Sequence, residues 1–83
     1  MTKPPVWEPI AGTLPPGVQC RHQTMVAGWL VVSELVLTGT GLAEVRLNGN
    51  PHGEAIAGSL TRARRIYRRV QNSVRPRQTL LLL

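Results

Sequence analysis

The sequence predicts an α+β fold in which a three-stranded antiparallel β-meander is followed by one long amphipathic, basic helix. Residues 18–47 are rich in β-branched side chains and alternate between apolar and polar, whereas apolar residues in 51–74 recur at helical spacing. Five prolines in residues 1–17 indicate an extended arm instead of regular structure. We therefore expect a single domain over 1–83, made of the arm, the meander, the helix and an apolar tail at 75–83.

The Pro-rich arm, residues 1–17, is unusually apolar for a free linker. It carries Val6, Trp7, Ile10 and Leu14 between its prolines. Burying such side chains is favourable, so we expect the arm to lie on the body of the domain.

Three strands are expected, over residues 18–26, 28–37 and 42–47, with turns at 27–28 and 38–41. In the second strand, alternation gives both sheet faces apolar residues. One helix covers only one face, so the other needs the arm, the tail or another chain. The competing interpretation is a buried helix over 25–37, but the flanking glycines and the β-branched and aromatic content favour strands.

The predicted helix, 51–74, has one narrow apolar stripe. Asn50 is a suitable N-cap, Pro51 suits the first turn, and Pro76 prevents continuation. The stripe consists of Ile56, Leu60, Ala63, Tyr67, Val70 and Val74.

The opposite side of this helix is basic. Residues 1–54 carry three basic residues against four glutamates, a net charge of −1, whereas 55–83 carry seven arginines and no acidic residue, a net charge of +7. A local basic field favours a polyanionic or acidic partner, although an ordinary solvated helix face has the same composition. The candidate partner-binding residues are Arg62, Arg65 and Arg69, flanked by Arg64 and Arg68.

The tail ends in four consecutive leucines, Leu80, Leu81, Leu82 and Leu83, which are unfavourable in water. They are candidate assembly residues. Two interpretations stay open: a final strand or cap on the exposed sheet face, and a contact between chains. Together with two apolar sheet faces, the tail favours a homodimer.

Catalysis is not expected. The chain has no Asp, and Cys20 and His22, two residues apart on one strand, are more typical of structural roles than of a thiol site. One Cys and two His have no recognisable metal-ligand spacing, so we predict neither a metal nor a cofactor. Without a membrane-spanning apolar run or a signal sequence, a cytoplasmic protein that does not enter the membrane is expected.

Strands over 18–47 followed by a helix over 51–74 resemble plant AP2-type DNA-binding domains, and also the second half of double-stranded RNA-binding domains. The whole chain is similar in size and architecture, without a residue-level motif, to small phage-encoded inhibitors such as anti-CRISPR proteins. That resemblance implies occlusion of a host nucleoprotein machine without catalysis.

Our leading hypothesis is a phage or mobile-element protein that engages nucleic acid, or a host complex that handles it, through the arginine-rich helix. A stand-alone nucleic-acid-binding module is one alternative. The other is a structural subunit that assembles through its apolar sheet face and leucine tail.

Overall fold

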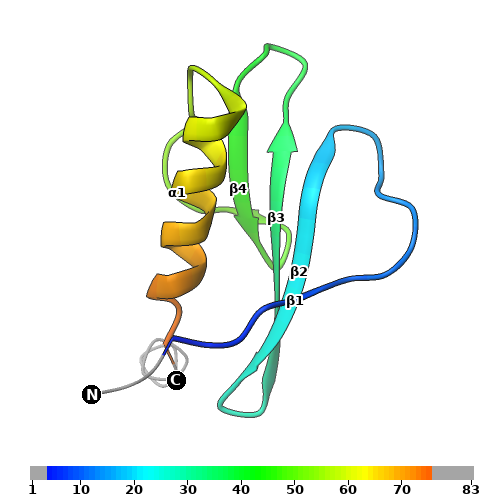
Figure 1. The fold of residues 1–83 in the computed structure, drawn as a ribbon, viewed down its shortest axis with the longest axis vertical. Coiled ribbons are helices and arrows are strands. Elements are labelled where there is room, and N and C mark those ends of the chain that lie inside the picture. Colours follow the sequence, from blue (N-terminus) through cyan, green and yellow to red (C-terminus); the bar gives the residue numbers. More distant parts are fainter. Residues whose placement is uncertain (1–3, 76–83) are drawn as a thin grey trace.

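The computed structural model describes residues 4–75 and shows an α+β domain, in which one antiparallel sheet carries a helix on one face (Figure 1). The helix, α1, spans Leu60–Ser73. The strands follow chain order across the sheet: β1 (Glu8–Pro9), β2 (Val18–Val26), β3 (Trp29–Leu37), β4 (Ala43–Leu47) and β5 (Asn50–Pro51). The α+β class is confirmed, but the expected count of three strands was wrong, because the sheet has five.

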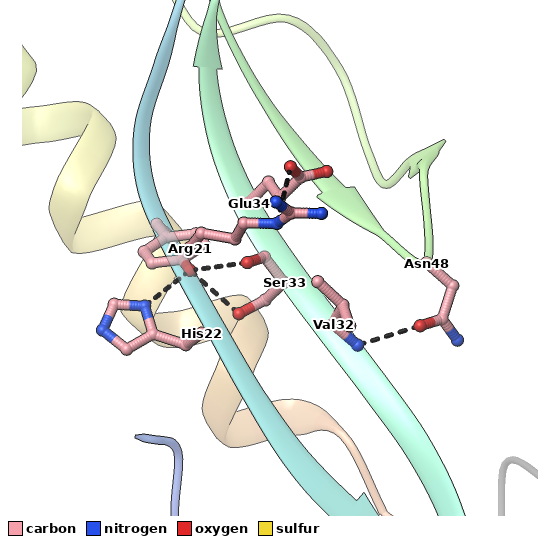
Figure 2. Close-up of polar contacts among 7 residues, drawn as sticks. Arg21, His22, Val32, Ser33, Glu34 and Asn48 are labelled. Carbon is pink, nitrogen blue, oxygen red and sulfur yellow. Dashed lines mark hydrogen bonds and ion pairs between the residues drawn. The ribbon is translucent and has the colours of Figure 1, made fainter. Parts of the chain in front are cut away.

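The extra strand β5 follows a two-residue turn. Asn48 and Gly49 both adopt positive φ, 50° and 83°. This left-handed pair matches the twist of adjacent strands, and Asn-Gly is the strongest short-range signal for such a hairpin. The Asn48 side chain also accepts a hydrogen bond from the Val32 backbone N–H at 2.8 Å, which extends the ladder between β3 and β4 (Figure 2).

The other extra strand, β1, comes from the arm. Glu8 pairs with Gln23 and Pro9 with His22, and the Ile10 N–H donates to the Arg21 carbonyl at 3.1 Å. A proline is tolerated here because β1 is an edge strand and one side of it needs no ladder hydrogen bond. The arm therefore lies on the body as expected, but partly as a strand.

The helix begins nine residues later than the sequence analysis predicted. Ile56 pairs with Ala43 through two backbone hydrogen bonds of 2.7 and 2.9 Å, so this part of the predicted apolar stripe belongs to the sheet. Gly53 and Gly58 have φ of +82° and +106°, which a right-handed helix does not allow. The segment 51–59 is therefore not helical.

The helix N-cap is Ser59 instead of the expected Asn50. The Ser59 hydroxyl accepts from the Arg62 N–H at 3.2 Å, as an N-cap side chain does for a donor that the first turn leaves unpaired. At the other end Val74 is the C-cap, in an extended conformation, close to the predicted end. With 14 residues, α1 is about 21 Å long instead of about 36 Å.

The hydrophobic core lies between α1 and the central strands. Leu60, at the start of the predicted stripe, is more than one-third exposed, because it occupies the first helical position at the edge of this contact. The buried cluster consists of Leu35, Ala43, Val45, Ile56, Ala63 and Tyr67.

The sheet face away from α1 is crossed by charges, so it is less apolar than expected. Arg46 donates to Glu44 at 2.7 Å, and Arg21 Nε lies 3.4 Å from Glu34 Oε2 (Figure 2). The second contact is electrostatic only, because Arg21 Nε is buried and has no hydrogen-bond partner among the described residues. The register places Glu34 opposite both Arg21 and Arg46, so charges alternate across β2, β3 and β4.

We expect Gly17→Ala to destabilise the fold more than a matched glycine substitution. Gly17 has φ of +84°, and a Cβ there would lie 2.9 Å from the Leu37 carbonyl oxygen. Gly41, at φ +82°, has open space around the same position. Both alanine variants pay about 1–2 kcal/mol for the left-handed backbone, and Gly17→Ala loses about 1–3 kcal/mol more through steric overlap. Denaturant unfolding measures both, and equal losses would contradict the prediction.

Candidate functional site

The outward side of α1 carries a cluster of exposed arginines around one shallow hollow. The hollow is open to solvent and has a volume of about 530 Å³. Arg62 is exposed but does not line the hollow, so four of the five candidate arginines are brought together. We call these four, Arg64, Arg65, Arg68 and Arg69, the arginine face. Thr61 and Asn72 complete the lining.

Helical spacing explains this arrangement. Arg64 and Arg68 are one turn apart, as are Arg65 and Arg69, so two columns of guanidinium groups run along one side of α1. Thr61 and Asn72 were not among the predicted site residues, although their spacing of four from Arg65 and Arg68 places them on the same side.

No carboxylate balances the arginine face within residues 4–75. The ion pairs of this region, Arg21–Glu34 and Arg46–Glu44, lie on the opposite side of the sheet, and α1 contains no acidic residue. Like charges one turn apart destabilise an isolated helix by a few tenths of a kcal/mol per pair. An anion bound between the columns would relieve this repulsion, and guanidinium groups suit phosphate because they donate two parallel hydrogen bonds.

A buried polar network lies beneath the arginine face and joins α1 to the sheet. The Tyr67 hydroxyl lies 2.9 Å from both Ser33 Oγ and His22 Nδ1, and 3.1 Å from the Ser33 carbonyl oxygen. Gln71 Nε2 donates to Ser33 Oγ at 3.0 Å. Figure 2 shows His22 and Ser33 on neighbouring strands, both directed toward the meeting point of these bonds.

One proton assignment gives each of these contacts a donor and an acceptor. Ser33 and the Nδ1–H of His22 donate to the Tyr67 oxygen, while Tyr67 donates to the Ser33 carbonyl. Gln71 then donates to the free lone pair of Ser33. Burial, followed by the positive charge of nearby Arg68, lowers the pKa of His22 and so favours this neutral imidazole.

The sequence pattern did not predict this network, because Tyr67 was expected in an apolar stripe and no role was expected for Ser33 and Gln71. Residue spacing could have indicated these roles. Ser33 lies two residues before the buried Leu35 and so on the same face of the strand, and Gln71 follows Tyr67 by one helical turn.

The arm bonds to the backbone of Gln71, whose side chain belongs to this network. Trp7 Nε1 donates to the Gln71 carbonyl oxygen at 3.1 Å, so the arm is attached to the C-terminal end of α1. In Figure 1 the arm passes from that end of the helix to the edge of β2. The two ends of the described chain therefore meet at one end of the domain.

The titratable and nucleophilic candidates do not form a second site. Ser33 has 0% exposure, and His22 directs Nδ1 toward Tyr67. Cys20 is partly buried and packs against the core. In residues 4–75, no group of three His, Cys, Asp or Glu side chains is arranged to hold a metal ion. That the protein is not an enzyme stays a prediction.

Comparison with known proteins gives no match, whether to a family model, to a curated protein or to a solved structure. None of the helices in the described part of the chain is long and apolar enough to cross a membrane. The candidate assembly residues Leu80–Leu83 lie outside the described residues.

We predict an unusually alkaline titration for Tyr67. Burial is the main cause that raises the pKa of this hydroxyl from 10.0 to about 12. The folded state then holds the proton more tightly than the unfolded state, so stability is lost as the pH rises from 10 through about 12. The chain has one tyrosine, so near-ultraviolet tyrosinate absorbance reports Tyr67 alone. A native midpoint equal to that in denaturant would disprove the prediction.

We also predict an acid-sensitive contribution from His22. Its pKa in the folded state is lowered from 6.5, so below pH 6.5 the unfolded chain takes up a proton that the folded chain resists. Stability should fall as the pH drops through this window. Arg68→Gln should reduce the pKa shift and this loss, whereas Arg62→Gln, which removes a charge that does not contribute to the shift, should not. NMR titration of the His22 ring and denaturant midpoints measure both, and an identical effect of the two variants would contradict the assigned cause.

Proposed function

We propose that this protein is a non-catalytic binding protein that engages nucleic acid through the arginine face. The observation that carries the proposal is the gathering of four arginines around one open hollow, with no carboxylate on α1. The proposal includes a cytoplasmic location, where nucleic acids and the complexes that handle them are accessible.

Charge, geometry and accessibility support a phosphate ligand. Each guanidinium donates to two phosphate oxygens, and two columns one helical turn long offer sites for successive phosphates. The hollow has no aromatic lining, so nothing in it would stack on unpaired bases. We therefore favour contacts to the sugar-phosphate backbone over recognition of base sequence.

The anti-CRISPR-like hypothesis assigns a different partner to the same surface. There the arginine face would bind an acidic surface of a host nucleoprotein complex and block it. Both hypotheses need the same residues, so the partner and not the site distinguishes them. In the structural-subunit hypothesis the arginines only solvate the domain, and assembly, including the predicted homodimer, depends on other surfaces.

We expect binding to duplex DNA to weaken steeply with salt. If each member of the arginine face neutralises one phosphate, the plot of log affinity against log salt should have a slope of about −3.6. Replacing Arg65 and Arg69 by glutamine should make the slope shallower by about 1 for each lost contact. Thermal stability should change little, because both side chains are exposed and relief of like-charge repulsion offsets lost contacts. Fluorescence anisotropy with labelled duplex at several salt concentrations measures the slope.

Two control variants test whether charge at this surface is responsible. Arg65→Lys with Arg69→Lys keeps the charge and should keep the slope, and Arg46→Gln, on the far face of the sheet, should have little effect. Negligible binding to DNA and RNA at low salt would overturn the nucleic-acid proposal. If the glutamine variants then abolished binding to a host complex, the inhibitor hypothesis would replace it. If they abolished no interaction, the arginines would be a solvated face.

A further inference from the structure

The hollow on α1 has two short, uncharged side chains midway between its two columns of arginines. Successive residues of an α-helix are about 100° apart around the axis, so the two columns of the arginine face also diverge by about 100°. The same spacing places Thr61 and Asn72, about three turns apart, on the line midway between the columns. Both residues line the hollow with the four arginines. We call Thr61 and Asn72 the central row.

This side of α1 is convex and free of the rest of the described chain. All the residues that line the hollow are exposed, whereas the buried residues of α1, Ala63, Tyr67 and Gln71, lie on the opposite side. Side chains project outward from a helix axis, so the guanidinium groups of the two columns point away from each other. This divergence suits two rows of phosphates, one along each side of the helix.

The dimensions of α1 match one groove of duplex DNA. An α-helix with its side chains is about 10–12 Å across, and the major groove of B-form DNA is about 12 Å wide, whereas the minor groove is about 6 Å wide. The sheet covers one side of α1, so about half of its diameter, roughly 5–6 Å, projects. This is less than the major-groove depth of about 8.5 Å. The helix therefore enters the groove without filling it, which favours contacts to phosphates over contacts to bases.

We propose that α1 docks in the major groove of duplex DNA, with each arginine column on the phosphates of one strand and the central row over the base pairs. The inference rests on the proposed function and specifies its ligand. Docking from this side is favoured by charge, because the arginines of the far sheet face are paired with Glu34 and Glu44. Duplex RNA does not fit, since its major groove is deep and narrow. A single strand supplies only one row of phosphates.

Three ligands of one sequence test this proposal: a DNA duplex, an RNA duplex and a single DNA strand. Fluorescence anisotropy of the full chain at one low salt concentration measures the three affinities. We expect the DNA duplex to bind at least about tenfold more tightly than either of the others, because only it offers both columns a row of phosphates.

A blocked groove tests which groove α1 enters. Glucosylated 5-hydroxymethylcytosine in place of cytosine fills the major groove, on the edge where thymine carries its methyl group, and leaves both backbones unchanged. We expect this duplex to bind about tenfold or more weakly than the unmodified duplex. Netropsin, which occupies the minor groove of A·T-rich duplexes, should not compete.

Both columns are required if each contacts its own strand. Replacing Arg64 and Arg68 by glutamine, or Arg65 and Arg69, should weaken binding to the DNA duplex to a similar extent. Either variant should also lose the preference for DNA over RNA duplex, since one remaining column needs only one row of phosphates. Arg46→Gln, on the far face of the sheet, is the control and should keep the preference. Circular dichroism checks that each variant is folded.

The outcomes separate this inference from the proposed function. Equal affinities for the three ligands would overturn groove docking and leave the proposed function intact. Unchanged binding to the glucosylated duplex, competition by netropsin, or a column whose removal leaves the DNA affinity unchanged would do the same. Absence of binding to all three ligands would overturn the proposed function and this inference with it.

Discussion

The position of α1 on the sheet depends on the hydrogen bonds of Tyr67. Its hydroxyl joins Ser33 and His22 from below the helix, and Gln71 completes the network one turn later. Leaving a buried polar group unpaired costs about 1–3 kcal/mol, so rotating α1 by one residue, about 100°, would break several of these bonds at once. Because the rotation is fixed in this way, the four arginines between the buried positions face solvent, whereas Ile66 and Val70 pack against the core. A polar network in the core thus determines the charge pattern at the surface.

Hydrophobic periodicity predicted the structure correctly where a single period, of a strand or of a helix, applied to the whole segment. The three main strands and their turns could be predicted because alternation in β2–β4 is bounded by glycines. The side of α1 that faces solvent could be predicted because the spacing of Arg64 to Arg69 does not depend on where the helix begins. The roles of Ser33 and Gln71 could not be predicted, because they depend on a hydrogen bond between two residues that are 38 positions apart in the sequence.

The predictions were wrong where hydrophobic periodicity and local backbone preference indicated different structures. The helical spacing of apolar residues includes Ile56, so periodicity alone predicts a helix that begins before Leu60. Gly53 and Gly58, however, adopt backbone conformations that a helix does not allow. Ile56 contributes to the core from the sheet side, through its pairing with Ala43. The additional strand β5 consists of Asn50 and Pro51, the residues expected to be the helix N-cap and first turn, and it follows an Asn-Gly turn. Local backbone preferences of glycine and asparagine outweighed hydrophobic periodicity in both places.

The bond from Trp7 to the Gln71 carbonyl has a consequence for how the domain assembles. It joins residues 64 positions apart, and Gln71 presents its carbonyl in this place only after α1 has packed on the sheet. Long-range contacts of this kind form late, because the chain between them must first be ordered. The arm is synthesised before α1 and is therefore expected to be the last part of the domain to reach its native position. Its apolar side chains stay in solvent until α1 has been synthesised and has packed on the sheet.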